Sequence, residues 1–248
     1  MFLFKDQVVL ITGGASGMGA ACAKRFSEAG ATVHIVDING DLARSHAAEI
    51  MATPFVGDVS QSQFCDDVVG SIVETHGRLD VCINAAGIIL RADALATSDD
   101  GWQQVMNVNV NGVFYMSRAA VAPMLAQGKG TIINFGSIWG GVGATNVVAY
   151  CASKGAVHQI TRAMALDYVE KGVRINAVCP GEVDTPMLRS NRERPPTEAD
   201  MQKLADSVPM KRLADPDEIA QVVLFLASDQ ASYMTGAMVP VDAGFTTR

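Results

Sequence analysis

Short apolar runs rich in β-branched residues alternate with helix-patterned segments along the chain. Several runs, among them Val8–Ile11 and Val81–Asn84, are apolar on both faces, which is typical of strands in a parallel sheet that helices cover on both sides. Strict alternation of strand and helix predicts a single α/β domain over residues 1–248, built on a doubly wound parallel sheet. The expected strands are Val8–Ile11, Thr32–Val36, Thr53–Val56, Val81–Asn84, Thr131–Phe135, Arg174–Val178 and Met238–Val241. The expected helices lie near Met18–Ala29, Gly40–Met51, Gln61–His76, Asp99–Ala126, Ser153–Lys171 and Asp215–Ala227.

The segment Pro186–Pro209 interrupts this alternation with polar residues, prolines and arginines. Connections of this length without secondary structure are uncommon inside compact domains, and many of them cover active sites. We therefore expect a substrate lid at about residues 186–209.

The charge and hydropathy of the chain limit its partners. The formal net charge is −7 and no basic run occurs, so the electrostatic footprint of a nucleic-acid-binding protein is missing. No apolar stretch reaches the roughly 18 residues of a membrane span. The apolar N-terminus, MFLFKDQVVLITGG, is interrupted by Lys5 and Asp6 and lacks a basic lead and a cleavage-type site. It is therefore expected to lead into the first strand rather than to act as a signal peptide.

Five cysteines are scattered along the chain without the spacing of metal ligands, and their number is odd. Small apolar thiols in a reducing, cytoplasmic setting explain this pattern most simply, so no metal site is expected. The residues are Cys22, Cys65, Cys82, Cys151 and Cys179.

A glycine-rich turn follows the first expected strand, in the run TGGASGMGAACAKRF. Gly13, Gly17 and Gly19 have the spacing T-G-x-x-x-G-x-G. Glycines let the chain turn sharply and approach a pyrophosphate closely, while the helix that begins there points free N–H groups at the negative charge. Such glycines also occur for packing alone, but their place after the first strand favours a nucleotide site.

Asp37 ends the second β-rich run, eighteen residues after Gly19. A carboxylate there can accept hydrogen bonds from both hydroxyls of an adenosine ribose. It would also repel a 2′-phosphate by about 4 kcal/mol at roughly 4 Å, for an effective dielectric constant near 20. A strand-end aspartate on its own could simply be solvated, but together with the glycine turn Asp37 favours NAD over NADP.

Polar and small residues follow two further expected strands. Asp58 could accept a hydrogen bond from an adenine amino group, with Val59 packing nearby. Ala85 and Gly87, which follow Asn84, would let a ribose lie close to the backbone. Ligands bind at the carboxyl ends of parallel strands in this architecture, although turn chemistry alone could account for each residue.

Tyr150 and Lys154 lie four residues apart and would share one face of a helix. The chain contains this Y-x-x-x-K spacing once, thirteen residues after Ser137 at the end of the run TIINFGS. A free tyrosine, with a pKa of about 10, is a poor base at neutral pH. A neighbouring ammonium group is expected to lower the pKa of the phenol and to make it a usable acid and base. The alternative is a core tyrosine beside a solvated lysine.

Taken together, the motifs resemble those of the short-chain dehydrogenase/reductase family, over the chain from Val8 to Gly244. The resemblance implies a single Rossmann-type domain, a nicotinamide cofactor and a homotetramer. It rests on the glycine turn from Thr12 to Gly19, on Asn84-Ala85-Ala86-Gly87, on Ser137, on Tyr150-x-x-x-Lys154 and on Pro180-Gly181.

The resemblance also implies roles for the chemical residues. Tyr150 resembles the family's general acid and base, and Lys154 resembles the partner that lowers its pKa and holds the nicotinamide ribose. Ser137 resembles the residue that hydrogen-bonds the substrate oxygen. Asn109, in the run VNVNGVF, matches an asparagine that supports a water link to the lysine, but Asn107 and Asn111 lie close by in the sequence.

For the cofactor, the resemblance places Val183 and Thr185 at the nicotinamide carboxamide. Ala85 departs from the asparagine that many members have there. The full set of expected cofactor residues is Gly13, Ser16, Gly17, Met18, Gly19, Asp37, Ile38, Asp58, Val59, Asn84, Ala85, Gly87, Tyr150, Lys154, Pro180, Gly181, Val183 and Thr185.

The residues expected around the substrate are mostly apolar, which suits a hydrophobic secondary alcohol or ketone, cyclic molecules included. Three arginines of the expected lid, Arg189, Arg192 and Arg194, could instead clamp a carboxylate or a phosphopantetheine, or form a solvated face. The expected substrate residues are Ser137, Trp139, Val142, Tyr150, Glu182 and Met187.

Three functions remain open on this evidence. The first is an NAD-dependent alcohol dehydrogenase or ketone reductase. The second is a 3-oxoacyl-thioester reductase, whose acidic carrier protein would bind basic residues such as Lys129 and Lys171. Such reductases commonly use NADPH, and Asp37 speaks against that cofactor. The third is a catalytically silent NAD(H)-binding sensor, which the complete set of catalytic residues makes the weakest hypothesis.

Overall fold

The computed structural model describes residues 4–192 and 194–247. The start of the expected approach to the first strand, residues 1–3, lies outside the described residues. So does residue 193 of the expected lid.

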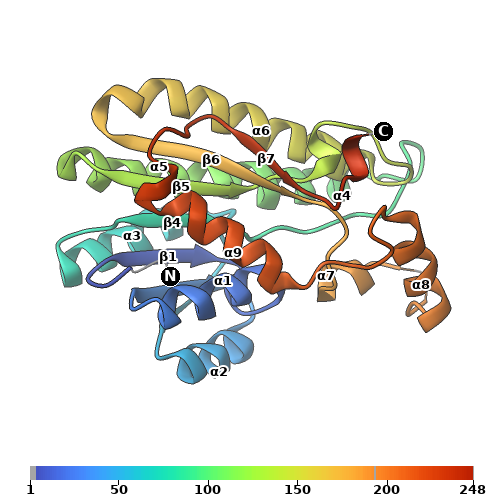
Figure 1. Cartoon of the computed structure of the whole chain (residues 1–248), viewed down its shortest axis with the longest axis horizontal. Helices are drawn as coiled ribbons and strands as arrows, with labels where there is room; N and C mark the ends of the chain where they lie inside the picture. Colours follow the sequence, from blue (N-terminus) through green and yellow to red (C-terminus); the bar gives the residue numbers. More distant parts are fainter. Residues whose placement is uncertain (1–3, 193, 248) are drawn as a thin grey trace.

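Seven strands of the described chain form one parallel sheet in the order β3-β2-β1-β4-β5-β6-β7 (Figure 1). The chain builds the sheet outward from β1 in one direction and from β4 in the other, so the strand order reverses between these two strands. In the pairing of β1 with β4, Thr12 lies opposite Asn84, and both strands therefore end at the same level. The expected doubly wound α/β fold is confirmed. The strands are β1 (Val8–Thr12), β2 (Thr32–Asp37), β3 (Thr53–Val56), β4 (Val81–Asn84), β5 (Gly130–Phe135), β6 (Val173–Pro180) and β7 (Met238–Val241).

Helices cover both faces of the sheet. Val9 and Ile11 of β1 belong to the core cluster formed with one set of helices, while Val8 and Leu10 belong to the cluster on the other face. Both faces of β1 are therefore buried, as its two-sided apolar sequence predicts. One face carries α1 (Gly17–Glu28), α2 (Gly40–Ile50) and α9 (Pro216–Ala227), and the other carries α3 (Ser62–His76), α5 (Gly112–Gln127) and α6 (Val148–Tyr168).

The expected helix Asp99–Ala126 is not continuous, so this prediction is wrong in detail. The helix α4 (Asp99–Met106) leads into a π-helical turn, Asn107–Asn111, before α5 begins. Within this turn Asn109 is fully buried and exchanges two hydrogen bonds with the backbone of Ile88. A widened turn of this kind often marks a functional site, and the apolar pattern of the sequence does not reveal it.

The helix α6 begins at Val148, five residues before the expected start at Ser153. Tyr150 and Lys154 consequently both lie on α6. A short 3-10 turn, Val169–Lys171, carries the helical segment on to the expected end.

The expected lid contains two short helices, α7 (Pro186–Arg189) and α8 (Glu198–Ser207). Pro186 stands at the first helical position of α7, where a missing N–H costs no hydrogen bond. In α8 the Thr197 hydroxyl accepts a hydrogen bond from the Asp200 backbone, and the Asp200 carboxylate accepts one from the Thr197 backbone. Sequence alone predicts no helix in this segment. We refer to residues 186–209 as the lid.

No helix of the described residues has both the length and the apolar character that crossing a bilayer requires. In the same part of the chain, no three potential metal ligands lie together. The five cysteines are free thiols.

Candidate active site

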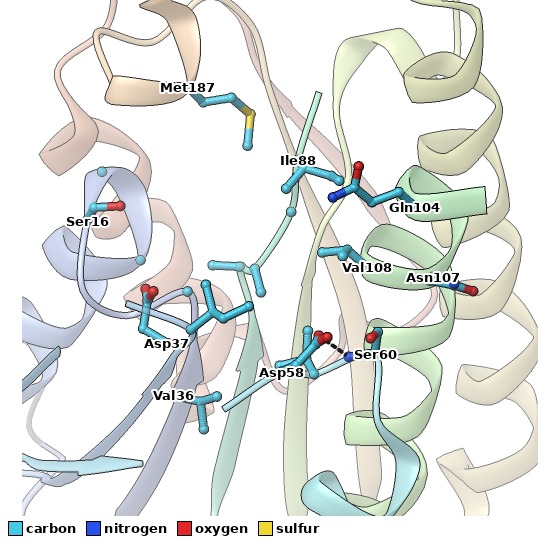
Figure 2. Close-up of a pocket in the computed structure, with 18 of the residues that line it drawn as sticks. Ser16, Val36, Asp37, Asp58, Ser60, Ile88, Gln104, Asn107, Val108 and Met187 are labelled. Carbon is cyan, nitrogen blue, oxygen red and sulfur yellow. Dashed lines mark hydrogen bonds between the residues drawn. The ribbon is translucent and has the colours of Figure 1, made fainter. Parts of the chain in front are cut away.

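Two adjoining cavities lie at the carboxyl ends of the strands. The larger has a volume of about 710 Å³ and follows the ends of β1, β2, β3 and β4 (Figure 2). The smaller, of about 380 Å³, lies between the ends of β5 and β6 and the lid. Met18, Thr185 and Met187 line both cavities, so the two spaces meet at these residues.

Most of the expected cofactor residues come together in the larger cavity. They are Gly13, Ser16, Gly17, Met18, Gly19, Asp37, Ile38, Asp58, Val59, Ala85, Gly87 and Thr185. Four others, Tyr150, Pro180, Gly181 and Val183, line the smaller cavity, while Asn84 and Lys154 line neither.

The glycine turn has a backbone that other residues would not tolerate. Gly13 and Gly17 have φ angles of +65° and +54°, and a Cβ at Gly19 would lie 2.1 Å from the carbonyl oxygen of Gly13. The turn delivers the chain directly into α1, whose preceding residue Ser16 is exposed and makes no side-chain cap. The first N–H groups of α1 therefore face the cavity mouth without a side-chain acceptor, an arrangement that suits a pyrophosphate.

Asp37 places its carboxylate in the larger cavity, at the end of β2 (Figure 2). One oxygen accepts a hydrogen bond from the backbone of Ala15 at 3.1 Å and the other accepts one from Asn39 at 3.0 Å, so the side chain is held in place. The described residues that line this cavity include the carboxylates of Asp37, Asp58 and Asp100 but no lysine or arginine. The lining therefore fits an adenosine with free ribose hydroxyls better than one with a 2′-phosphate.

Most of the residues expected to contact the substrate and transfer its proton line the smaller cavity. Ser137, Trp139, Tyr150, Glu182 and Met187 all line it, as expected for substrate residues. Val142 does not line it and is 45% exposed, because the chain turns away from the cavity after the short 3-10 turn Ile138–Gly140. The lid contributes Leu188, Arg192 and Leu204 in addition to Met187.

Tyr150 lies on α6 and lines the cavity together with Ser137, which is near enough to influence the pKa of the phenol. Burial is the largest influence on this phenol and raises its pKa to about 12, with a smaller contribution from the negative charge of Glu182. The polar hydroxyl of Ser137 and the charge of Arg91 act in the opposite direction and lower the pKa. The expectation that Lys154 lowers the tyrosine pKa is therefore wrong for the protein without ligands. Burial makes the phenolate costly to form, and this raises the pKa overall.

Lys154 lies one turn further along α6 and is 4% exposed. Its Nζ donates a hydrogen bond of 2.7 Å to the carbonyl oxygen of Phe135, at the end of β5, and lies 5.5 Å from the centre of the Tyr150 ring. Burial lowers the pKa of Lys154 to about 8. The hydrogen bond to Phe135 thus replaces only part of the hydration that the ammonium group loses on burial.

Asn109 reaches the same region from the π-helical turn. Its amide donates to the carbonyl oxygen of Ile88 and to the hydroxyl of Ser153, which is adjacent to Lys154 in the chain, and its own oxygen accepts from the Ile88 backbone. These bonds fix the segment after β4 against α6. Asn107, by contrast, lines the larger cavity, and Asn111 donates a hydrogen bond to Asn107, so the three asparagines that the sequence leaves open lie in different surroundings.

Asn84 is buried away from both cavities. Its amide donates to Ser117 on α5 and to Asn134 on β5, and the amide of Asn134 donates in turn to Thr161 on α6. This buried chain of hydrogen bonds ties β4 and β5 to the helices on one face. The side chain of Asn84 is therefore engaged in a structural network, and its expected contact with the cofactor stays a prediction.

His158 was not singled out by its sequence context, yet it packs beneath the loop that carries Ser137. Its Nε2 lies 3.3 Å from the sulfur of Cys179. A Cβ at Gly136 or at Gly140 would come within 2.6 Å of the His158 ring. The two glycines therefore let the loop pack directly on the ring, and this packing fixes the position of Ser137 relative to Tyr150. Arg91, which lines the smaller cavity, was also not predicted.

Known proteins share this architecture along nearly the whole chain. A family model described as enoyl-(acyl carrier protein) reductase matches residues 13–246. The chain is 41% identical to 2-(S)-hydroxypropyl-CoM dehydrogenase 3 of Xanthobacter autotrophicus, over 98% of this chain and 97% of that protein. It is 40% identical to meso-2,3-butanediol dehydrogenase of Serratia marcescens, over 98% of this chain and 96% of that protein. A solved structure of 3-ketoacyl-(acyl-carrier-protein) reductase from Brucella melitensis, complexed with NADH, is 33% identical with a TM-score of 0.92 and covers 98% of this chain and 99% of that chain.

The chain belongs to the short-chain dehydrogenase/reductase family. It is thus an oxidoreductase of the class that interconverts CH–OH groups and carbonyls.

Replacing Lys154 by methionine should stabilise the protein at pH 7, because the change removes a buried ammonium group. The pKa of about 8 in the folded protein lies below the ordinary lysine value of 10.5. At about 1.4 kcal/mol per pKa unit, and allowing for imperfect packing of the new side chain, we expect a gain of about 1–3 kcal/mol in the free energy of unfolding. Urea unfolding of both proteins measures the difference.

The pH dependence provides the control. As the pH rises, Lys154 loses its proton in the folded protein before it does so in the unfolded protein. The buried charge therefore destabilises the fold fully below about pH 8, and this destabilisation disappears as the pH rises toward 10.5. The advantage of Lys154→Met should shrink over that range. A variant that is less stable than the wild type at pH 7 would show that the ammonium group is not a cost to the fold.

Proposed function

We propose that the protein is an NAD-dependent dehydrogenase that interconverts a secondary alcohol and its ketone by hydride transfer. The observation that carries this proposal is the placement of Tyr150 and Ser137 together on a small cavity that opens into the acid-lined larger one. The names of two relatives, a hydroxypropyl-CoM dehydrogenase and a butanediol dehydrogenase, also describe oxidation of alcohols.

In this proposal the larger cavity holds the adenosine end of the cofactor, with the glycine turn at the pyrophosphate and Asp37 at the ribose diol. Lys154 and Asn109 keep the neighbouring part of the site in shape through their bonds to Phe135 and Ile88. When bound, the oxidised nicotinamide supplies the hydride acceptor and a positive charge.

Tyr150 handles the proton of the reaction. In the oxidising direction its phenol oxygen takes the proton of the substrate hydroxyl, and in the reducing direction it returns that proton to the developing alkoxide. Ser137 donates a hydrogen bond to the same substrate oxygen and stabilises the charge that develops there. Burial favours the protonated phenol, so in the oxidising direction the phenol must first release its own proton, which additional positive charge near its oxygen would favour.

The substrate is expected to be small. The cavity volume of about 380 Å³ and the ring of Trp139 suit a compact secondary alcohol, cyclic alcohols included. Most of the described residues that line this cavity are apolar, and the charged side chains of Arg91, Glu182 and Arg192 line it as well.

A thioester reductase remains the second candidate, because the matching family model and one structural neighbour carry acyl-carrier-protein reductase descriptions. Rates with an acetoacetyl thioester and NADPH distinguish the two functions. Faster reduction of that thioester than turnover of any free alcohol or ketone would favour the second candidate.

Tyr150→Phe removes only the phenolic oxygen and should lower kcat by at least 100-fold, a loss typical of a missing general acid and base. NADH affinity, measured by fluorescence titration, should change by less than about threefold, since Tyr150 lines the smaller cavity. Tyr168→Phe, on the same helix, serves as the matched control and should keep wild-type rates. A Tyr150→Phe protein that retains a tenth of wild-type kcat would rule out this role.

Asp37→Ser should reduce the preference for NAD over NADP from both sides, by weakening the diol contact and by relieving repulsion of the 2′-phosphate. Repulsion of about 2–3 kcal/mol corresponds to roughly 30- to 150-fold discrimination, and solvent screening lowers it, so we expect wild type to prefer NAD by more than tenfold in kcat/KM. Ile38→Arg added to Asp37→Ser should reduce the preference further.

Asp41→Ser is the control for this experiment, since Asp41 is exposed and pairs with Arg44 outside the cavity. Equal use of the two cofactors by wild type, or an unchanged ratio in Asp37→Ser, would mean that Asp37 does not select the cofactor. The thioester reductase would then become the better hypothesis.

We further propose a homotetramer. Trp102 on α4, Phe114 on α5 and Leu166 on α6 are 38%, 40% and 79% exposed, and exposed apolar surface of this kind is typical of interfaces. Val157 and Met164 on α6 are buried in the subunit's own core and so do not belong to this surface. Light scattering should give four times the chain mass of 26.2 kDa. A monomer at micromolar concentration would contradict the proposal.

A further inference from the structure

Two arginines from distant parts of the chain converge on the cavity that contains Tyr150. Arg91 follows β4 and Arg192 belongs to the lid, and both line the smaller cavity. They are close enough that the charge of Arg192 lowers the pKa of Arg91, although burial lowers it more. Two like charges held together in a partly enclosed space cost free energy unless a negative charge compensates them.

These arginines have no carboxylate partner among the described residues. Arg91 donates to the carbonyl oxygens of Ser190 at 3.2 Å and of Leu188 at 3.3 Å, and Arg192 donates to the carbonyl oxygen of Leu188 at 2.9 Å. Most other arginines behave differently and pair with an acidic side chain, namely Arg25, Arg44, Arg78, Arg118, Arg189, Arg194 and Arg212. The carbonyl bonds use Nε of both residues and Nη2 of Arg91, which leaves N–H donors of each guanidinium available.

Glu182 is the one acidic residue among the described residues that line this cavity. Its carboxylate makes no hydrogen bond and no ion pair in the described structure, although both arginines are near enough to influence its pKa, which burial raises. With Glu182 ionised, the two arginines still leave one net positive charge on the cavity wall. The other lining side chains carry no charge.

We propose that Arg91 and Arg192 bind an anionic group of the substrate, a carboxylate or a sulfonate, while the carbinol carbon lies against Ser137 and Tyr150. The inference rests on the proposed alcohol dehydrogenase function and names its substrate class. Guanidinium groups present paired N–H donors that match the two oxygens of such an anion, and these charge-assisted bonds are among the stronger ones in proteins. Glu182 faces the same space and limits the affinity, because it repels the anion.

The first experiment compares each anion with a neutral molecule of nearly the same shape. Wild-type kcat/KM with NAD is measured for 2-hydroxypropanoate, 3-hydroxybutanoate and 4-hydroxypentanoate, each beside its own amide, and for 2-hydroxypropane-1-sulfonate. The series varies the distance between carbinol and anion. At least one carboxylate should exceed its amide by tenfold to a hundredfold, which corresponds to about 1.4–2.8 kcal/mol.

Variants then assign this preference to the two arginines. Arg192→Gln should lower kcat/KM for the preferred anion by at least tenfold and change that of its amide by less than threefold. Arg91→Gln also removes the bonds to Leu188 and Ser190 of the lid, so it should lower kcat/KM for both molecules, and for the anion by at least tenfold more than for the amide. Arg192→Lys, which keeps the charge but loses the paired donors, should fall in between. Glu182→Gln should increase the preference for the anion. Arg194→Gln is the matched control, because Arg194 belongs to the same lid but pairs with Asp200.

The results separate this inference from the proposed function. If wild type oxidises the amides as well as the anions, or if the two glutamine variants keep the preference, the inference is wrong and the dehydrogenase function stands. If wild type oxidises none of these alcohols with either cofactor, calorimetric titration of the same anions and amides still decides. Binding of an anion that Arg91→Gln and Arg192→Gln weaken at least tenfold supports the inference, and equal binding by all the variants overturns it.

Discussion

The parallel pairing of all the strands in the described sheet is the constraint on which the site depends. Because every strand runs in the same direction, each connecting helix returns the chain to the end of the sheet where the strands begin. The turns that follow the strands therefore all lie at the opposite end, where the strands finish. Gly13, Asp37, Ser137 and Glu182 are far apart in sequence, yet they line two adjoining cavities there. The reversal of strand order between β1 and β4 separates the turns enough to leave room for a ligand.

Burial sets the electrostatic state of the reactive groups. It raises the pKa of Tyr150 and lowers that of Lys154, so in the protein alone it moves both groups toward their neutral forms. The hydrogen bond from Lys154 to the carbonyl oxygen of Phe135 fixes the position of the lysine but does not prevent this lowering of its pKa. A positive charge brought close to the phenol oxygen by a ligand would act against this effect of burial.

Much of this architecture could be predicted from the sequence, because alternating apolar runs and glycine spacing report local conformation directly. Every strand was expected, and the glycine turn, Asp37, Ser137 and Tyr150 all line the cavities. The π-helical turn at Asn109 could not be predicted, since it changes the helix without changing the apolar pattern. Nor could the convergence of Arg91 with the lid or the packing of His158, because both depend on contacts between segments distant in sequence. The direction in which the pKa of Tyr150 shifts could not be predicted either, because it depends on how deeply the folded chain buries the phenol.

The hydrogen bonds of the two cavity arginines bear on how the specificity of such an enzyme can evolve. Arg91 bonds across the molecule to Leu188 and Ser190 and so helps to hold the lid to the body, whereas Arg192 bonds to a residue four positions earlier in its own segment. If the two arginines bind substrate as proposed, a change at Arg91 alters substrate contacts and lid attachment together, while a change at Arg192 leaves the attachment through Arg91 in place. Divergence toward new substrates in this lineage is therefore expected to begin at position 192, with position 91 changing only after other contacts secure the lid.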